Sequence, residues 1–125
     1  MAKSDYKLTS EQIQIEGKSP VTVFHLSGWL DAHSEKQLET SAQEAYESGV
    51  RYLVLDLADI ETLTSAGMRA IERVYKLFTP RDDKTAYLKL CSAPPQVYHV
   101  LGITGFLLTM PMYENLQAAL DSFEA

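Results

Sequence analysis

VRYLVLDLADIETLTSAGMRAIERVYKLF, residues 50–78, is the stretch that decides the fold. It opens on the almost continuous apolar run Tyr52–Leu57, interrupted only by Asp56, which predicts a strand buried on both faces. Residues 58–63 are expected to form a polar connector. From Met68 to Phe78 apolar residues then recur at spacings of three and four, the pattern of one buried helix face. The segment is therefore predicted to run strand, loop, helix.

The helix is expected to begin at the sequence Thr64-Ser65-Ala66-Gly67. Ser65 then lies where unpaired backbone N–H groups and the positive end of the helix dipole converge, which marks its hydroxyl as a candidate for modification or nucleophilic chemistry. The ordinary alternative is helix capping, because Ser and Thr are preferred at the N-cap position. One cap suffices, however, and the small Ala66 and Gly67 are expected to leave the backbone open to another molecule.

The rest of the chain predicts strands and helices in alternation after an N-terminal antiparallel hairpin. The predicted elements, in chain order, are strands at 11–16 and 21–27, a helix at 35–48, the strand and helix described above, a strand at 86–91, a short helix around 97–101, a strand at 107–110 and a helix at 116–123. Ser34 and Gln37 form a capping-box pattern before the first helix. The order ββαβαβαβα predicts an α/β domain with a mostly parallel sheet of about five strands and helices packed against it.

Length and composition limit the classes of protein to consider. A chain of 125 residues is expected to form one domain, residues 1–125. The net charge of −6 argues against a nucleic-acid partner and against an anionic membrane surface. Cys91 is the only cysteine, which suits a reducing compartment. No apolar run reaches a membrane span, and residues 1–10 lack the apolar core of a signal peptide, so a cytoplasmic protein is expected.

The candidate site is expected at one edge of the sheet. The loops after Leu30, Leu57 and Cys91 follow parallel strands, and the carboxyl ends of such strands share an edge where ligands bind. Asp31 directly follows Gly28-Trp29-Leu30 at this edge and is therefore a candidate site residue.

Metal and nucleotide sites are not indicated. His25, His33 and His99 are scattered, and no second cysteine is available to complete a tetrahedral site, so no metal ligands are expected. Each histidine is expected to be a surface or packed residue. Neither of the glycine-rich phosphate-binding patterns occurs.

A small serine hydrolase is one alternative. Ser65-Ala66-Gly67 lies between a strand and a helix like half of a nucleophile elbow, and Asp82, Asp83 and His99 follow in a suitable order. Leu63 stands where the elbow needs glycine, and the predicted connector is long for a sharp strand-to-helix corner. These two features count against a catalytic role.

Several stretches resemble the STAS domain of bacterial anti-sigma factor antagonists, and the resemblance covers nearly the whole chain. They are LSGWLD at 26–31, LVLDL at 53–57, LTSAGM at 63–68, LGITGF at 101–106 and YENLQAAL at 113–120. Many members carry Asp-Ser-Ser-Gly where this chain has Thr64 to Gly67, and others carry Ser-Ser-Ala-Gly. An acidic residue usually stands in place of Trp29, so an exposed Trp29 is predicted to anchor an interface; alternatively it covers the edge of the core.

The resemblance implies a phosphorylation-switched binding module without catalytic residues or cofactor. The unmodified protein would bind an anti-sigma factor, often a serine kinase, and so release a sigma factor. The kinase would phosphorylate Ser65, and a metal-dependent phosphatase would reset the switch. The partner-binding residues expected beside Ser65 are Trp29, Asp31, Thr64, Ala66, Gly67 and Met68. The alternative within the family is a scaffold or adaptor in a stress-signalling or lipid-transport complex, which would not be controlled at Ser65.

Overall fold

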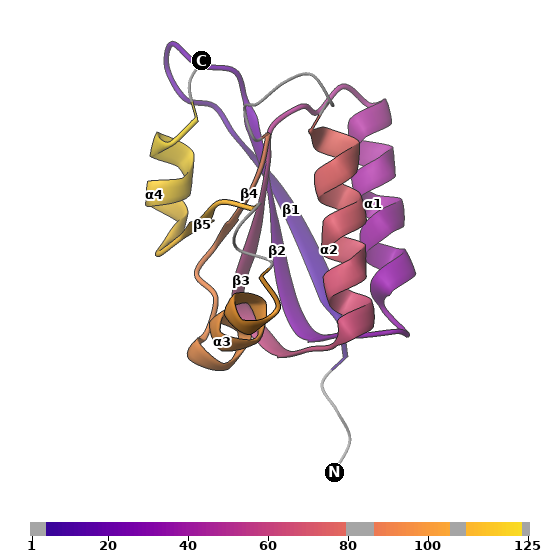
Figure 1. Ribbon diagram of the computed structural model, residues 1–125. Coiled ribbons are helices and arrows are strands. Elements are labelled where there is room, and N and C mark those ends of the chain that lie inside the picture. The colour runs from indigo at the N-terminus through magenta and orange to yellow at the C-terminus, as the bar shows by residue number, and fades with distance from the viewer. Residues whose placement is uncertain (1–4, 80–86, 106–109, 124–125) are drawn as a thin grey trace.

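A five-stranded sheet in the order β1-β2-β3-β4-β5 carries the fold of the computed structural model, which describes residues 5–79, 87–105 and 110–123 (Figure 1). The elements are β1 (Lys7–Ile13), β2 (Val21–Leu30), α1 (Glu35–Glu47), β3 (Leu53–Leu63), α2 (Ser65–Phe78), β4 (Leu88–Cys91), α3 (Pro95–Ile103), β5 (Met112–Tyr113) and α4 (Leu116–Asp121). Only β1 runs antiparallel to its neighbour, and the other three pairings are parallel. The predicted ββαβαβαβα order and mostly parallel sheet are confirmed.

Helices cover both faces of the sheet. Figure 1 shows α1 and α2 side by side on one face, α4 on the other, and α3 near the end of the sheet where α2 begins. Successive residues of β3 point to opposite faces. Leu53 and Leu55 therefore enter the larger core beneath α1 and α2, and Val54 enters the smaller core beneath α4. Arg73 of α2 bonds Glu39 of α1 at 2.9 Å on the outer surface.

The central strand is longer than its sequence predicts. β3 continues through residues 58–63, so the expectation of a polar connector there is wrong. Two bulges let this half of β3 pair with the end of β2, where Gly28 lies opposite Ile60 and Leu30 lies opposite Leu63. Ile60 and Leu63 are buried, while Glu61 between them is exposed. Pairing with β2 thus keeps a polar stretch in the sheet.

Other boundaries also differ from the predicted ones. The hairpin begins at Lys7 because β1 pairs along β2 from Ser27 to Val21, and β2 itself extends to Leu30. β4 begins at Leu88 rather than at residue 86. The helix expected around 97–101 runs from Pro95 to Ile103, because Gly105, not Gly102, takes the left-handed conformation. The last strand is Met112–Tyr113, and residues 107–109 of the predicted strand lie outside the described residues.

Candidate functional site

The corner between β3 and α2 is fixed to the end of β2. The backbone N–H of Thr64 donates to the carbonyl oxygen of Leu30 at 3.1 Å. Thr64 is the single residue between the end of β3 at Leu63 and the start of α2 at Ser65. The carboxyl ends of β2 and β3 therefore meet beside the first turn of α2, as expected for this edge of the sheet. β4 ends before it reaches this edge of the sheet, with Cys91 opposite Asp56.

Thr64, and not Ser65, caps helix α2. The Thr64 hydroxyl accepts a hydrogen bond from the N–H of Gly67 at 3.3 Å, and the Thr64 carbonyl accepts one from the N–H of Met68 at 2.9 Å. Ser65 occupies the first helical position and is exposed. Its hydroxyl makes no hydrogen bond with any residue that the structure describes. Because Thr64 satisfies the helix end, the Ser65 hydroxyl is available to solvent and to another molecule.

The small residues of the first turn serve packing within the chain. A Cβ added to Gly67 would lie 2.3 Å from the carbonyl oxygen of Leu30 and 2.8 Å from Cδ1 of Leu63. Ala66 is only 8% exposed. The expectation that these two residues leave the backbone open to another molecule is therefore wrong, because the space is filled by the end of β2. Ser65 is therefore exposed on a helical turn whose next two residues, Ala66 and Gly67, are buried.

Asp31 organises the loop from β2 to α1. It is 7% exposed, and its Oδ1 accepts hydrogen bonds from the backbone N–H groups of His33 at 3.0 Å and Ser34 at 3.3 Å. The Ser34 hydroxyl donates to the carbonyl oxygen of Trp29 at 2.8 Å and accepts from the N–H of Asp31 at 3.0 Å. Ser34 does not cap α1 through its side chain, so the capping box predicted with Gln37 is wrong. The Asp31 side chain therefore fixes the conformation of the loop that joins β2 to α1.

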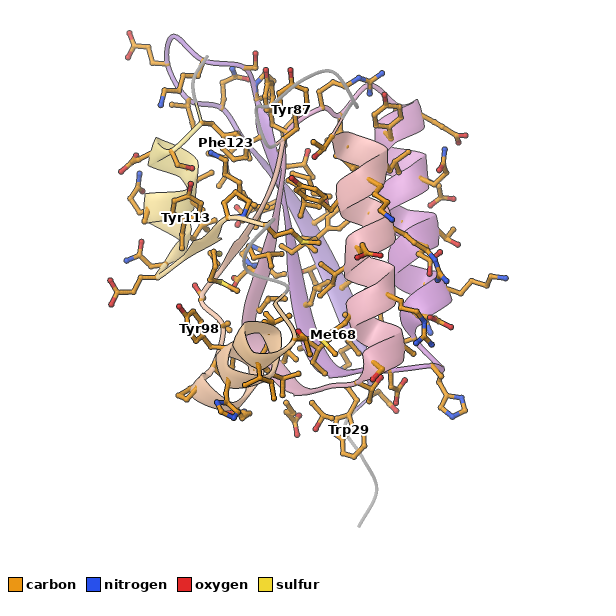
Figure 2. All side chains as sticks on the ribbon, viewed as in Figure 1. Trp29, Met68, Tyr87, Tyr98, Tyr113 and Phe123 are labelled. Atoms are coloured by element: carbon orange, nitrogen blue, oxygen red, sulfur yellow. The ribbon has the colours of Figure 1, made fainter. Side chains whose placement is uncertain are left out.

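Trp29 and Met68 both lie near the start of α2. Figure 2 shows Trp29 at the end of the molecule below α2, and Met68 between α2 and α3. Both side chains are half-buried. The Thr104 hydroxyl lies 3.9 Å from Sδ of Met68, which joins the end of α3 to the start of α2. The candidate site therefore comprises the β2–α1 loop, the first turn of α2 and the end of α3.

A histidine that the sequence left unassigned joins three strands. His25 of β2 lies with Nδ1 2.6 Å from Oδ2 of Asp56 on β3 and Nε2 2.6 Å from Oε1 of Glu11 on β1. Burial lowers the pKa of His25, but hydrogen bonds to Glu11 and Asp56 and their negative charges outweigh burial, so the pKa is raised. Alternation along a strand determines which side chains of that strand share a face. The contact of His25 with Glu11 and Asp56 depends in addition on the pairing register of the three strands.

Among the residues that the structure describes, no side chain is hydrogen-bonded to the Ser65 hydroxyl as a general base would be. General-base activation needs a base within hydrogen-bond reach of the hydroxyl, and no such hydrogen bond is made among the described residues. The strand-to-helix corner is sharp, so the expectation of a long connector does not count against a hydrolase, but Leu63 still occupies the glycine position. Asp82 and Asp83 lie outside the described residues, and His99 is exposed on α3.

The described residues contain neither a metal-binding cluster nor a membrane-spanning helix. Within residues 5–79, 87–105 and 110–123, no group of three or more His, Cys, Asp or Glu side chains is placed to hold a metal ion. Over the same residues, no helix combines the length and apolar character needed to cross a bilayer.

Comparison with known proteins identifies the family. The STAS domain model matches residues 12–119. The anti-sigma F factor antagonist of Paenibacillus polymyxa is 30% identical over 114 residues, which cover 90% of this chain and 95% of that protein. The chain therefore belongs to the STAS domain family.

Solved structures share the fold. An anti-sigma factor antagonist from Mycobacterium paratuberculosis superposes with a TM-score of 0.73 at 24% identity, covering 93% of both chains. SpoIIAA, an anti-sigma factor antagonist solved in its unphosphorylated form, superposes with a TM-score of 0.67 at 17% identity, covering 90% of this chain and 94% of that one. The Bacillus SpoIIAA in its phosphorylated form gives a TM-score of 0.65 at 18% identity, covering 92% and 97%.

Proposed function

We propose that this protein is an anti-sigma factor antagonist controlled by phosphorylation of Ser65. Unmodified, the single STAS domain, residues 1–125, binds an anti-sigma factor that is also a serine kinase, and so releases a sigma factor in the cytoplasm. The observation that carries the proposal is the exposed Ser65 hydroxyl at the start of α2, which bonds no residue that the structure describes, while Thr64 caps the helix. The role of the relatives supports it. The protein acts by binding and not by catalysis, and needs no nucleic acid or membrane.

Phosphorylation at this position suits a change in binding that leaves the fold intact. A phosphate adds a charge of about −1.5 to −2 and three acceptor oxygens. At the first position of α2 this charge lies beside the positive end of the helix dipole, where anions are stabilising. The Ser65 side chain contributes no hydrogen bond within the described residues that the modification would break.

The same phosphate opposes docking of a partner. A protein that covers Ser65 would have to desolvate the new dianion, which costs several kcal/mol unless the partner pairs it. A cost of about 4 kcal/mol weakens binding roughly a thousandfold. The partner-facing surface in this proposal consists of Trp29, Asp31, Thr64, Ala66, Gly67 and Met68 around Ser65, and Asp31, Ala66 and Gly67 act mainly by shaping it, since they are buried. A metal-dependent phosphatase would remove the phosphate.

The test measures binding of purified anti-sigma factors from the host organism by calorimetry. Ser65→Ala is expected to bind one of them as tightly as the unmodified protein, and Ser65→Asp at least tenfold more weakly. Ser19→Asp is the matched control, because it adds the same charge at an exposed position of the β1–β2 turn, beyond the opposite end of β2. Equal affinities of the Ser65 variants contradict the switch.

Mass spectrometry after incubation with the binding kinase and ATP tests the modification itself. Phosphate on Ser65 is expected. Binding without phosphorylation would favour a STAS scaffold or adaptor instead. Labelling of Ser65 by a serine-directed fluorophosphonate would favour a hydrolase.

A further inference from the structure

Helix α3 presents the exposed large apolar side chains of the described residues. Tyr98 is 52% exposed and Ile103 is 70% exposed. The helix is anchored from beneath by Val97 and Leu101, both buried. Val97 and Leu101 therefore attach α3 to the rest of the protein, and the exposed Ile103 side chain is not needed for this attachment.

The sequence around Ile103 is also depleted of charge. Residues 95–105 read PQVYHVLGITG and contain no Asp, Glu, Lys or Arg, although the chain carries 17 acidic and 11 basic residues. Depletion of charged side chains distinguishes the cores of protein interfaces from ordinary surface. Covering this part of α3 therefore desolvates no carboxylate, ammonium or guanidinium group within residues 95–105.

The contact between Met68 and Thr104 places Ile103 near Ser65. Met68 follows Ser65 by one helical turn, and its Sδ lies 3.9 Å from the hydroxyl of Thr104, the residue after Ile103. Summing one turn of helix, this contact and the joining bonds gives a path of at most about 20 Å from Ser65 to Ile103. A standard interface buries about 800 Å² on each partner, a patch about 32 Å across. Ser65 and Ile103 are therefore close enough for one interface of this size to include both.

We propose that the anti-sigma factor that covers Ser65 also buries Ile103 and Met68, and that Ile103 is its apolar anchor. This inference rests on the proposed function. The complementary surface of the partner is an uncharged apolar pocket that receives the Ile103 side chain beside the recess for Ser65. The phosphate then acts at one part of the interface while Ile103 supplies affinity at another.

The experiment compares Ile103→Ser with Tyr98→Ser in the full chain. Tyr98 is the matched control because Figure 2 shows it on the side of α3 away from Met68, and it lines a separate open cavity of about 350 Å³ with Met112 and Tyr113. Calorimetry with the purified anti-sigma factor is expected to give at least tenfold weaker binding for Ile103→Ser and a change under twofold for Tyr98→Ser. Both variants are expected to melt near the parent temperature, since neither side chain is buried.

The outcomes separate this inference from the proposed switch. If Ser65→Asp abolishes binding while Ile103→Ser leaves it unchanged, the anchor is overturned and the switch stands. Equal losses from both α3 variants would also overturn it. If the parent chain dimerises in sedimentation and Ile103→Ser makes it monomeric, a second copy occupies the surface and the anchor is again overturned. If no anti-sigma factor binds the parent chain, the proposed function and this inference both fail.

Discussion

Gly67 packs against Leu30 so closely that a Cβ on Gly67 would lie 2.3 Å from the Leu30 carbonyl oxygen. This contact joins the first turn of α2 to the end of β2 and fixes where Ser65 is presented. The obstructing atom belongs to the backbone, so it cannot move aside as a flexible side chain would.

Gly67→Ala is expected to lower the free energy of unfolding by about 2–4 kcal/mol, because overpacking here requires α2 or β2 to shift. Urea denaturation measures the change. Gly102→Ala in α3 is the control, because its added Cβ meets no atom within 4 Å, and it is expected to be neutral or stabilising by up to about 1 kcal/mol. Equal effects of the two substitutions would show that the contact with Leu30 is not tight.

Thr64→Ala is expected to cost about 0.5–2 kcal/mol of stability, because it removes the oxygen that caps the Gly67 N–H. Ser65→Ala is the neighbouring control and is expected to change stability by less than about 0.5 kcal/mol, as for a surface substitution. Thermal and urea unfolding of both variants measure the difference. A larger loss at Ser65 than at Thr64 would contradict the assignment of the cap.

The His25 cluster predicts a dependence of stability on pH. The folded-state pKa of His25 is raised, so its ion pairs with Glu11 and Asp56 stabilise the fold fully below the ordinary value of about 6.5 and lose that effect as pH rises through the folded pKa. Cys91 of β4 lies opposite Asp56, and burial raises its pKa to about 11, so the thiol stays neutral across this range. Lys7 lies on the same face of β1 as Glu11, and its side chain is exposed to solvent.

Urea denaturation at pH 6 and at pH 9 measures this dependence. Stability is expected to fall between the two, and the fall is expected to be smaller in His25→Gln. His99→Gln is the control, because His99 is exposed on α3. An NMR titration giving His25 a pKa at or below its ordinary value would refute the cluster.

Cys91 is expected to resist alkylation in the folded protein. It is fully buried, and burial raises its pKa to about 11, so little thiolate forms near neutral pH. Reaction with iodoacetamide is expected to be slow in buffer and fast in 6 M guanidinium. Because Cys91 is the only cysteine, the reaction reports directly on this position. Rapid labelling of the folded chain would show that β4 is accessible.

The sequence predicts those parts of the fold and site that depend on local pattern. Apolar spacing identified the core strand and the inward face of α2, and the Thr64–Gly67 stretch located the start of that helix. The mostly parallel sheet follows from the alternation of strands and helices, whereas the strand order β1-β2-β3-β4-β5 was not predicted. The exposure of Ser65 agrees with the expectation, and its phosphorylation stays a prediction.

Features that depend on pairing between distant segments were not predictable. The second half of β3 is polar and is kept in the sheet by its register with β2. The missing side chain of Gly67 was expected to leave room for another molecule, but the backbone of Leu30 at the end of β2 occupies that room. Ser34 matched a capping box, yet it bonds the loop that Asp31 organises. The contact between His25 and Glu11 forms only when β1 pairs with β2, so no local pattern in the sequence indicates it.

The measurement closest to the central claim compares the protein before and after stoichiometric phosphorylation of Ser65. Calorimetry with the purified anti-sigma factor is expected to show binding roughly a thousandfold weaker after modification, corresponding to about 4 kcal/mol. The melting temperature is expected to stay within about 2 °C of that of the unmodified protein. The phosphate would be attached to the exposed first residue of α2, where the helix dipole stabilises negative charge. Unchanged affinity after phosphorylation, or unfolding in place of release, would contradict the account.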